Sequence, residues 1–102
     1  MLFEVISGQI RLGEVDEFYK LHHDILLPAM AAVGIKPFLF LITEVGRFRR
    51  FIDIYQYDNM VDYEEKTNAL ISKDLREYYS RIQNCINGDL LIELMNKMPY
   101  SP

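Results

Sequence analysis

Residues 43–60 constrain the fold more than any other part of the chain. They read Thr-Glu-Val-Gly-Arg-Phe-Arg-Arg-Phe-Ile-Asp-Ile-Tyr-Gln-Tyr-Asp-Asn-Met, which is a short turn around Gly46 followed by aromatic and β-branched residues. Such a run, bounded by turn residues, predicts a β-strand over residues 50–57. A second run of this kind, residues 35–43, ends just before the turn, so the two strands should form an antiparallel hairpin.

A helical region is expected before the hairpin, following a first strand over residues 2–10. From Glu14 to Gly34 the apolar residues recur at helical spacing. Pro28 lacks an amide hydrogen and clashes with the preceding turn, which predicts a kink or a restart of the helix near Leu27.

Two further helical stretches and a last strand are expected after the hairpin. Asp58 or Asn59 should cap a helix that breaks near Ile71, and Ser72 should cap the next one, which ends at Asn87-Gly88. The final strand is expected over residues 90–95.

The order βαββαβ predicts an α+β, ferredoxin-like fold, in which helices cover one face of a four-stranded antiparallel sheet. A chain of 102 residues suits one domain, residues 1–102. The other face of the sheet would expose half of each apolar strand, and apolar patches of that size usually mark association surfaces. We therefore expect a homodimer in which two sheets face each other.

The charge of the chain argues against nucleic acid as a partner. Eleven Lys and Arg stand against fifteen Asp and Glu, for a net charge of -4, whereas binding to phosphate backbones relies on clustered positive charge. The one basic cluster, Arg47, Arg49 and Arg50, is expected to be the solvated mouth of the hairpin, or else to bind an anion or an acidic partner. No apolar run approaches the roughly 18 residues of a membrane span.

Cysteine usage predicts neither a disulfide nor a metal site. Cys85 is the only cysteine, so an intrachain disulfide and a CxxC-type zinc or redox site are excluded. No basic segment precedes an apolar segment at the start of the chain, so no secretory signal is expected. These features predict a cytoplasmic protein without a cofactor.

Several short motifs follow one another along almost the whole chain. They are Phe3-Glu4-Val5, Gly13 with Val15-Asp16-Glu17-Phe18, Thr43-Glu44-Val45-Gly46, the stretch Arg50 to Asp58, and Pro99-Tyr100-Ser101-Pro102. In this order and spacing they resemble the NIPSNAP family, small proteins of the dimeric α/β barrel superfamily. The resemblance implies a fold and no particular activity.

The chain also departs from the usual pattern of that family. Where relatives commonly carry an Arg and a Tyr on the first strand, this chain has Ile6 and Gly8. Where their third strand usually reads Asn, His and Trp, this chain has Arg49, Asp53 and Tyr55. Any function particular to this chain should therefore involve the positions that differ.

Asp53 is the first candidate for a ligand-binding residue, because it is a carboxylate in mid-strand on a row of aromatic residues. It could act as a general base or a hydrogen-bond acceptor; alternatively, it could pair with an Arg or a Tyr hydroxyl and have a structural role only. His22 lies on the apolar stripe of its helix, so it is either a core histidine or a proton-transfer group. It cannot share a metal ion with His23, because adjacent helix positions diverge.

Further candidates lie on the strands. Tyr55 and Tyr57 share the strand face of Asp53 and could orient a ligand in an apolar pocket, although core packing would also explain them. Ser7 could add a polar contact from the first strand, and Arg49 one from the hairpin. No catalytic residue is assigned.

Three hypotheses for function follow. The first is a homodimeric protein that binds a small apolar or aromatic molecule. The second is a cofactor-independent monooxygenase or isomerase, which the resemblance implies because some relatives in the superfamily act in this way. The third is a protein-interaction module whose barrel is packed solid. A cavity of roughly 300 Å³ or more that reaches Asp53 would favour a ligand site.

Overall fold

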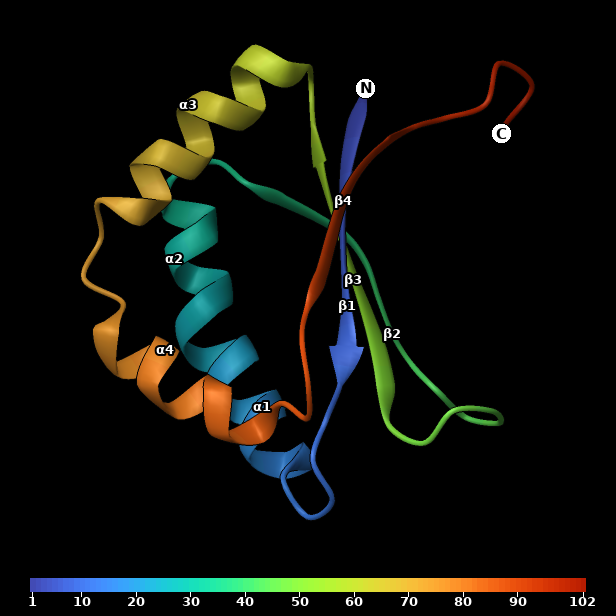
Figure 1. Ribbon diagram of the computed structural model, residues 1–102. Helices are drawn as coiled ribbons and strands as arrows, with labels where there is room; N and C mark the ends of the chain where they lie inside the picture. Colours follow the sequence, from blue (N-terminus) through green and yellow to red (C-terminus); the bar gives the residue numbers. More distant parts are fainter.

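One antiparallel sheet with helices on one of its faces makes up the protein, as the computed structural model of residues 1–102 shows (Figure 1). Its neighbouring strands are all antiparallel and follow the order β2-β3-β1-β4. The strands are β1 (Leu2–Gln9), β2 (Lys36–Ile42), β3 (Arg50–Tyr57) and β4 (Leu91–Asn96).

The helical layer lies on the left of the sheet in Figure 1. Its α-helices are α1 (Val15–Leu21), α2 (Leu27–Ala32), α3 (Met60–Ile71) and α4 (Arg76–Ile82), with a π-helical turn, η1 (His22–Leu26), and a 3-10 turn, η2 (Gln83–Cys85). The predicted ferredoxin-like order βαββαβ is confirmed. None of the helices has the length and apolar character needed to cross a membrane.

The π-helical turn explains how the first helical region accommodates Pro28. In η1 the amide of Leu27 donates to the carbonyl of His22, five residues back, which widens the helix just before the proline. Pro28 then lies in the first turn of α2, where an amide hydrogen is not required. The expected restart at Leu27 is confirmed, and the irregularity that causes it begins at His22.

Capping was predicted correctly at the start of α3 and wrongly at the start of α4. The side chain of Asn59 accepts from the amide of Asp62 at 2.9 Å. Ser72 instead ends α3, and its hydroxyl donates to the carbonyl of Ala69 at 2.7 Å. The carboxylate of Asp74 accepts from the amide of Arg76 at 3.3 Å, and α4 begins at Arg76, three residues later than an N-cap at Ser72 implies.

The face of the sheet that meets the helices carries both apolar and ionisable side chains. On β3 the alternate residues Phe51, Asp53, Tyr55 and Tyr57 are buried. The register of β1 places Glu4 beside Tyr55 and Ile6 beside Asp53. This face therefore brings two carboxylates next to the main apolar core.

The opposite, open face of the sheet is apolar and exposed, as the sequence predicted. Leu39 and Leu41 pair with Ile54 and Ile52 on this face, and Phe38, in a β-bulge, packs against Phe3. The exposed fractions of the large side chains at its two edges, Phe38, Leu39, Leu41, Leu91 and Met95, range from 43% to 56%.

Candidate functional site

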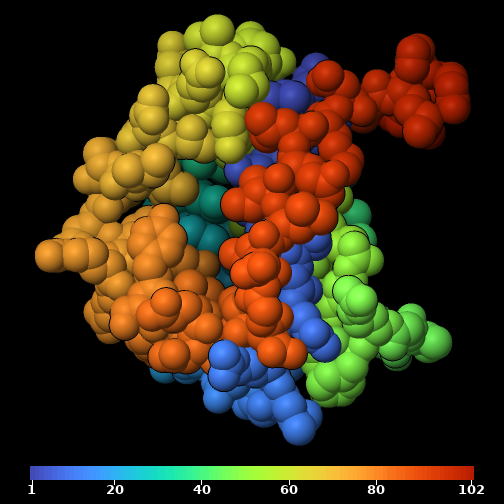
Figure 2. Space-filling model, in the orientation of Figure 1, coloured from blue at the N-terminus to red at the C-terminus, as the bar shows by residue number.

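A cavity of about 610 Å³ lies between the sheet and the helices. Its walls come from β1, β3 and β4 on one side and from the helical layer on the other, and most of the lining side chains are apolar. Figure 2 shows a recess between β4 and the helices, with α2 visible inside it. β4 covers the cavity incompletely, since Ile92, which lines it, is 54% exposed.

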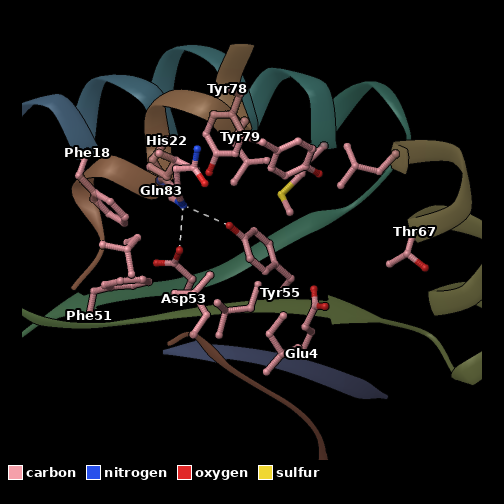
Figure 3. Close-up of a pocket in the computed structure, with 18 of the residues that line it drawn as sticks. Glu4, Phe18, His22, Phe51, Asp53, Tyr55, Thr67, Tyr78, Tyr79 and Gln83 are labelled. Atoms are coloured by element: carbon pink, nitrogen blue, oxygen red, sulfur yellow. Dashed lines mark hydrogen bonds and ion pairs between the residues drawn. The ribbon is translucent and has the colours of Figure 1, made fainter. Parts of the chain in front are cut away.

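Three predicted residues meet at one end of this cavity. Nε2 of His22 lies 3.0 Å from Oδ2 of Asp53 and 3.1 Å from the hydroxyl of Tyr55 (Figure 3). All three side chains are buried. The strand alternation of β3 directs Asp53 and Tyr55 to the same face, and the π-helical turn holds His22 above them.

Two aromatic rings hold the imidazole in place. The ring of Phe18 stacks on His22 at 5.7 Å between centroids, and the ring of Phe40 meets it edge-on at 4.8 Å. A carboxylate oxygen is an acceptor, so in this contact Nε2–H of His22 is the donor and Oδ2 of Asp53 is the acceptor. The pair of His22 and Asp53 therefore places a hydrogen-bonded polar group at the end of an otherwise apolar cavity.

The tyrosines of the cavity act as hydroxyl donors. Burial raises the pKa of Tyr55 well above its ordinary value, and the charge of Asp53 raises it further. Burial likewise raises the pKa of Tyr78, again with a contribution from Asp53. Neither phenol ionises near neutral pH, so both present O–H groups that can donate.

Glu4 is a second buried carboxylate, which sequence reasoning missed as a site residue. Its Oε1 accepts from the hydroxyl of Tyr57 at 3.1 Å, and its Oε2 accepts from the hydroxyl of Tyr63 at 3.0 Å. It lines the same cavity as Asp53. A signal was present, because Glu4 is the only charged residue in β1.

The environment of Glu4 predicts a pH effect on stability. Burial raises the pKa of its carboxyl above 4.5, and the hydrogen bonds from Tyr63 and Tyr57 only partly oppose this. A raised pKa in the folded state means that folding favours the protonated form. The contribution of Glu4 to stability is therefore greatest below pH 4.5 and is lost as the pH rises through the folded-state value.

We expect the difference in free energy of unfolding between wild type and Glu4→Gln to change with pH. As the pH is raised from 4 to 8, the wild type should lose stability relative to the variant. Urea unfolding of both proteins across this range measures it, with Glu65→Gln, an exposed position on α3, as the control. A difference between wild type and Glu4→Gln that does not change with pH would contradict the burial argument.

Ser7 and Arg49, two of the predicted ligand-binding residues, lie away from this cavity. Ser7 lines a separate hollow of about 420 Å³ together with Arg47 and Arg50. Arg49 lies in the hairpin turn with φ 53°, and its guanidinium is 5.1 Å from the ring centroid of Phe48. Strand alternation separates Ser7 from Asp53, because the two side chains project from opposite faces of the sheet. The three arginines of the turn are exposed, as expected.

Metal ligands are not clustered in the protein. No three side chains of His, Cys, Asp or Glu are placed to hold one metal ion. The sole cysteine, Cys85, is buried, and burial raises the pKa of its thiol. The candidate site thus consists of the cavity and its two carboxylate clusters.

Comparison with known proteins identifies the family. The NIPSNAP family model matches residues 3–102. No curated protein is significantly similar to the chain.

Solved structures resemble the chain over its full length. An uncharacterised NIPSNAP domain protein from Burkholderia xenovorans is 17% identical, with a TM-score of 0.87 and coverage of 100% of this chain and 99% of the other. A NIPSNAP family protein from Agrobacterium tumefaciens strain C58 is 19% identical, with a TM-score of 0.86 and coverage of 99% and 96%. An antibiotic biosynthesis monooxygenase is 13% identical, with a TM-score of 0.69 and coverage of 97% and 100%. At these identities the likeness concerns the fold.

Proposed function

Because this chain belongs to the NIPSNAP family, which implies no particular activity, we propose its function from the site: it binds a small aromatic molecule in the cavity between sheet and helices. The observation that carries the proposal is the cavity of about 610 Å³ that reaches Asp53. Ligand sites typically measure about 300–1,000 Å³, with apolar walls and a few convergent polar groups. Here His22, Asp53 and Tyr55 are the convergent polar groups.

The polar end of the cavity indicates what the ligand carries. Asp53 can accept a hydrogen bond, and Tyr55 can donate one, while Phe18 and Phe51 offer flat apolar surface beside them. A phenol combines an aromatic ring with a hydroxyl that can use both partners. The proposed ligand is therefore a phenol, with its hydroxyl at the cluster of His22, Asp53 and Tyr55.

A second candidate function is proton transfer, as in a cofactor-independent monooxygenase or an isomerase. It is favoured by the contact of 3.0 Å between His22 and Asp53, because such a pair can take a proton from a bound phenol and return it. A fold shared with an antibiotic biosynthesis monooxygenase is compatible with this chemistry. The open cavity counts against the third hypothesis, a solid barrel with an interaction role alone.

We further propose that the protein is a homodimer joined through the open faces of its two sheets. Large apolar side chains lie half-exposed at both edges of that face, whereas the candidate cavity lies on the other side of the sheet. Dimer formation would therefore cover the apolar face without closing the cavity.

The ligand proposal can be tested with 2-naphthol. We expect the protein to bind it and Asp53→Asn to bind it about tenfold to hundredfold more weakly, because a hydrogen bond to a charged group contributes about 1.5–3 kcal/mol. Isothermal titration calorimetry measures both affinities. Asp24→Asn is the control, since it removes the same charge from an exposed aspartate on η1.

Binding that is unaffected by Asp53→Asn, or no binding at all, would contradict the proposal. Turnover separates the two candidate functions. An enzyme of the proposed type consumes oxygen or rearranges the phenol at a rate that falls in His22→Gln, whereas a binding protein returns the phenol unchanged.

A further inference from the structure

The polar groups of the cavity form two separate clusters. His22 and Asp53 lie on one side of Tyr55, and Glu4 lies on the other, toward Thr67 (Figure 3). The pairing of β1 with β3 also separates the two carboxylates. Glu4 lies opposite Tyr55, and Ile6, the next residue of β1 on the same face, lies opposite Asp53. A ligand that fills the cavity can therefore contact a different polar cluster at each end.

The charges around the cavity are of one sign. Its lining includes the carboxylates of Glu4, Asp53 and Asp89 but no lysine or arginine. The one basic side chain, His22, already contacts Asp53 at 3.0 Å. A bound anion would find no cation here to compensate its loss of hydration.

Glu4 has no positively charged partner of its own. It is 6% exposed, and both of its protein partners, Tyr57 and Tyr63, are neutral hydroxyls. Burial of a carboxylate without a cation is unfavourable. Each carboxylate oxygen has a lone pair left after its bond to a tyrosine, so Glu4 can accept one more donor from the cavity.

The surroundings of Glu4 also suit a cation. Tyr57, whose hydroxyl donates to Glu4, lines the cavity beside it, and Tyr55, which also lines the cavity, is its strand neighbour. Aromatic faces attract ammonium groups, most strongly where water is excluded. Carboxylate and rings together form the chemistry that recognises a protonated amine.

We propose that Glu4 is a specificity-determining residue that selects ligands with a protonated amine, so that the cavity prefers arylalkylamines to alcohols and excludes carboxylates. This inference rests on the proposed function, because it needs the aromatic ring of the ligand to occupy the same cavity. The proposed ligand then carries two polar groups: a phenol hydroxyl that binds at His22, Asp53 and Tyr55, and an ammonium group that binds at Glu4.

Three probes with the same 4-hydroxyphenyl ring test the inference: tyramine, tyrosol and 4-hydroxyphenylacetate, which end in an ammonium, a hydroxyl and a carboxylate. We expect wild-type protein to bind tyramine about tenfold to hundredfold more tightly than tyrosol, as a charge-assisted hydrogen bond implies, and 4-hydroxyphenylacetate most weakly. Titration calorimetry at pH 7 gives the three dissociation constants.

Glu4→Gln should remove the preference for tyramine over tyrosol, because glutamine keeps the shape of the side chain but has no charge and only one acceptor oxygen. Glu65→Gln removes an equal charge from the exposed side of α3 and should change nothing. Tyr63→Phe keeps the carboxylate and frees one of its lone pairs, so it should preserve the preference even if Glu4→Gln does not fold.

The outcomes separate the two proposals. If tyrosol binds but tyramine binds no more tightly, or if Glu4→Gln retains the preference, the role of Glu4 is wrong and the phenol site stands. Binding of 4-hydroxyphenylacetate as tight as that of tyramine would overturn the role of Glu4 as well. If none of the three probes binds, both proposals fail.

Discussion

Replacing Leu39 and Leu41 together with glutamate is expected to dissociate the proposed dimer into monomers. Both leucines lie on the open face and are nearly half-exposed. In the proposed dimer they would pack between two sheets, which lie about 10 Å apart in such arrangements. Burying a charge there without a partner costs several kcal/mol per ion, so the dimer dissociation constant should rise by more than about a hundredfold.

Sedimentation equilibrium at micromolar concentration measures the effect. Val61 and Ile71 offer a matched control, because they are 63% and 73% exposed on α3 and their replacement by glutamate adds the same charge. The control variant should remain dimeric. A wild-type protein that is monomeric, or a double variant that is still dimeric, would contradict the proposed interface.

Replacing Asp53 with leucine is expected to lower the free energy of unfolding by about 3 kcal/mol or more. The change leaves His22 buried with only the hydroxyl of Tyr55 as a partner, and breaking a buried pair on one side costs about 3–5 kcal/mol. In a domain of this size each kcal/mol lowers the melting temperature by about 4–8 °C. Calorimetric melting should therefore show a decrease of roughly 12–40 °C.

A double-mutant cycle measures the interaction free energy between His22 and Asp53. Together, His22→Phe and Asp53→Leu should cost less than the sum of the two single changes, because the double variant leaves neither group buried and unpaired. His23 and Asp24 form the control pair: their side chains contact each other at 2.8 Å but are 82% and 57% exposed. Asp24→Leu should lower the free energy of unfolding by less than about 1 kcal/mol. If the effects of His22→Phe and Asp53→Leu on the free energy of unfolding are additive, the two side chains do not stabilise each other and the proposed pairing is wrong.

Most of the fold could be predicted from local patterns. The strand Arg50–Tyr57 has the predicted bounds, and the helix that follows it ends at Ile71 as expected. Runs of β-branched and aromatic residues, and caps such as Asn59, act over a few residues and are therefore visible in the sequence. Ser72 misled because a serine can serve at either end of a helix, and the choice depends on how the next helix packs.

The candidate site was predicted in part. Asp53, Tyr55, Tyr57 and His22 line one cavity as expected, whereas Ser7 does not line it. The first three share a strand face, which alternation reveals. The contact of His22 with these residues depends on how the first helical region packs on the sheet. It also depends on the π-helical turn, which Pro28 alone does not predict.

The sequence by itself determined the order of the elements, the hairpin of residues 35–57 and the two-faced character of the strands, because these follow from local backbone preferences and from the period of the side chains. Only the tertiary structure decided that His22 contacts Asp53, that Glu4 faces the same cavity with Tyr63 beside it, and that Ser7 and Arg49 lie elsewhere. Such contacts join residues 30 to 60 positions apart, and their distances depend on how the layers pack rather than on any local pattern.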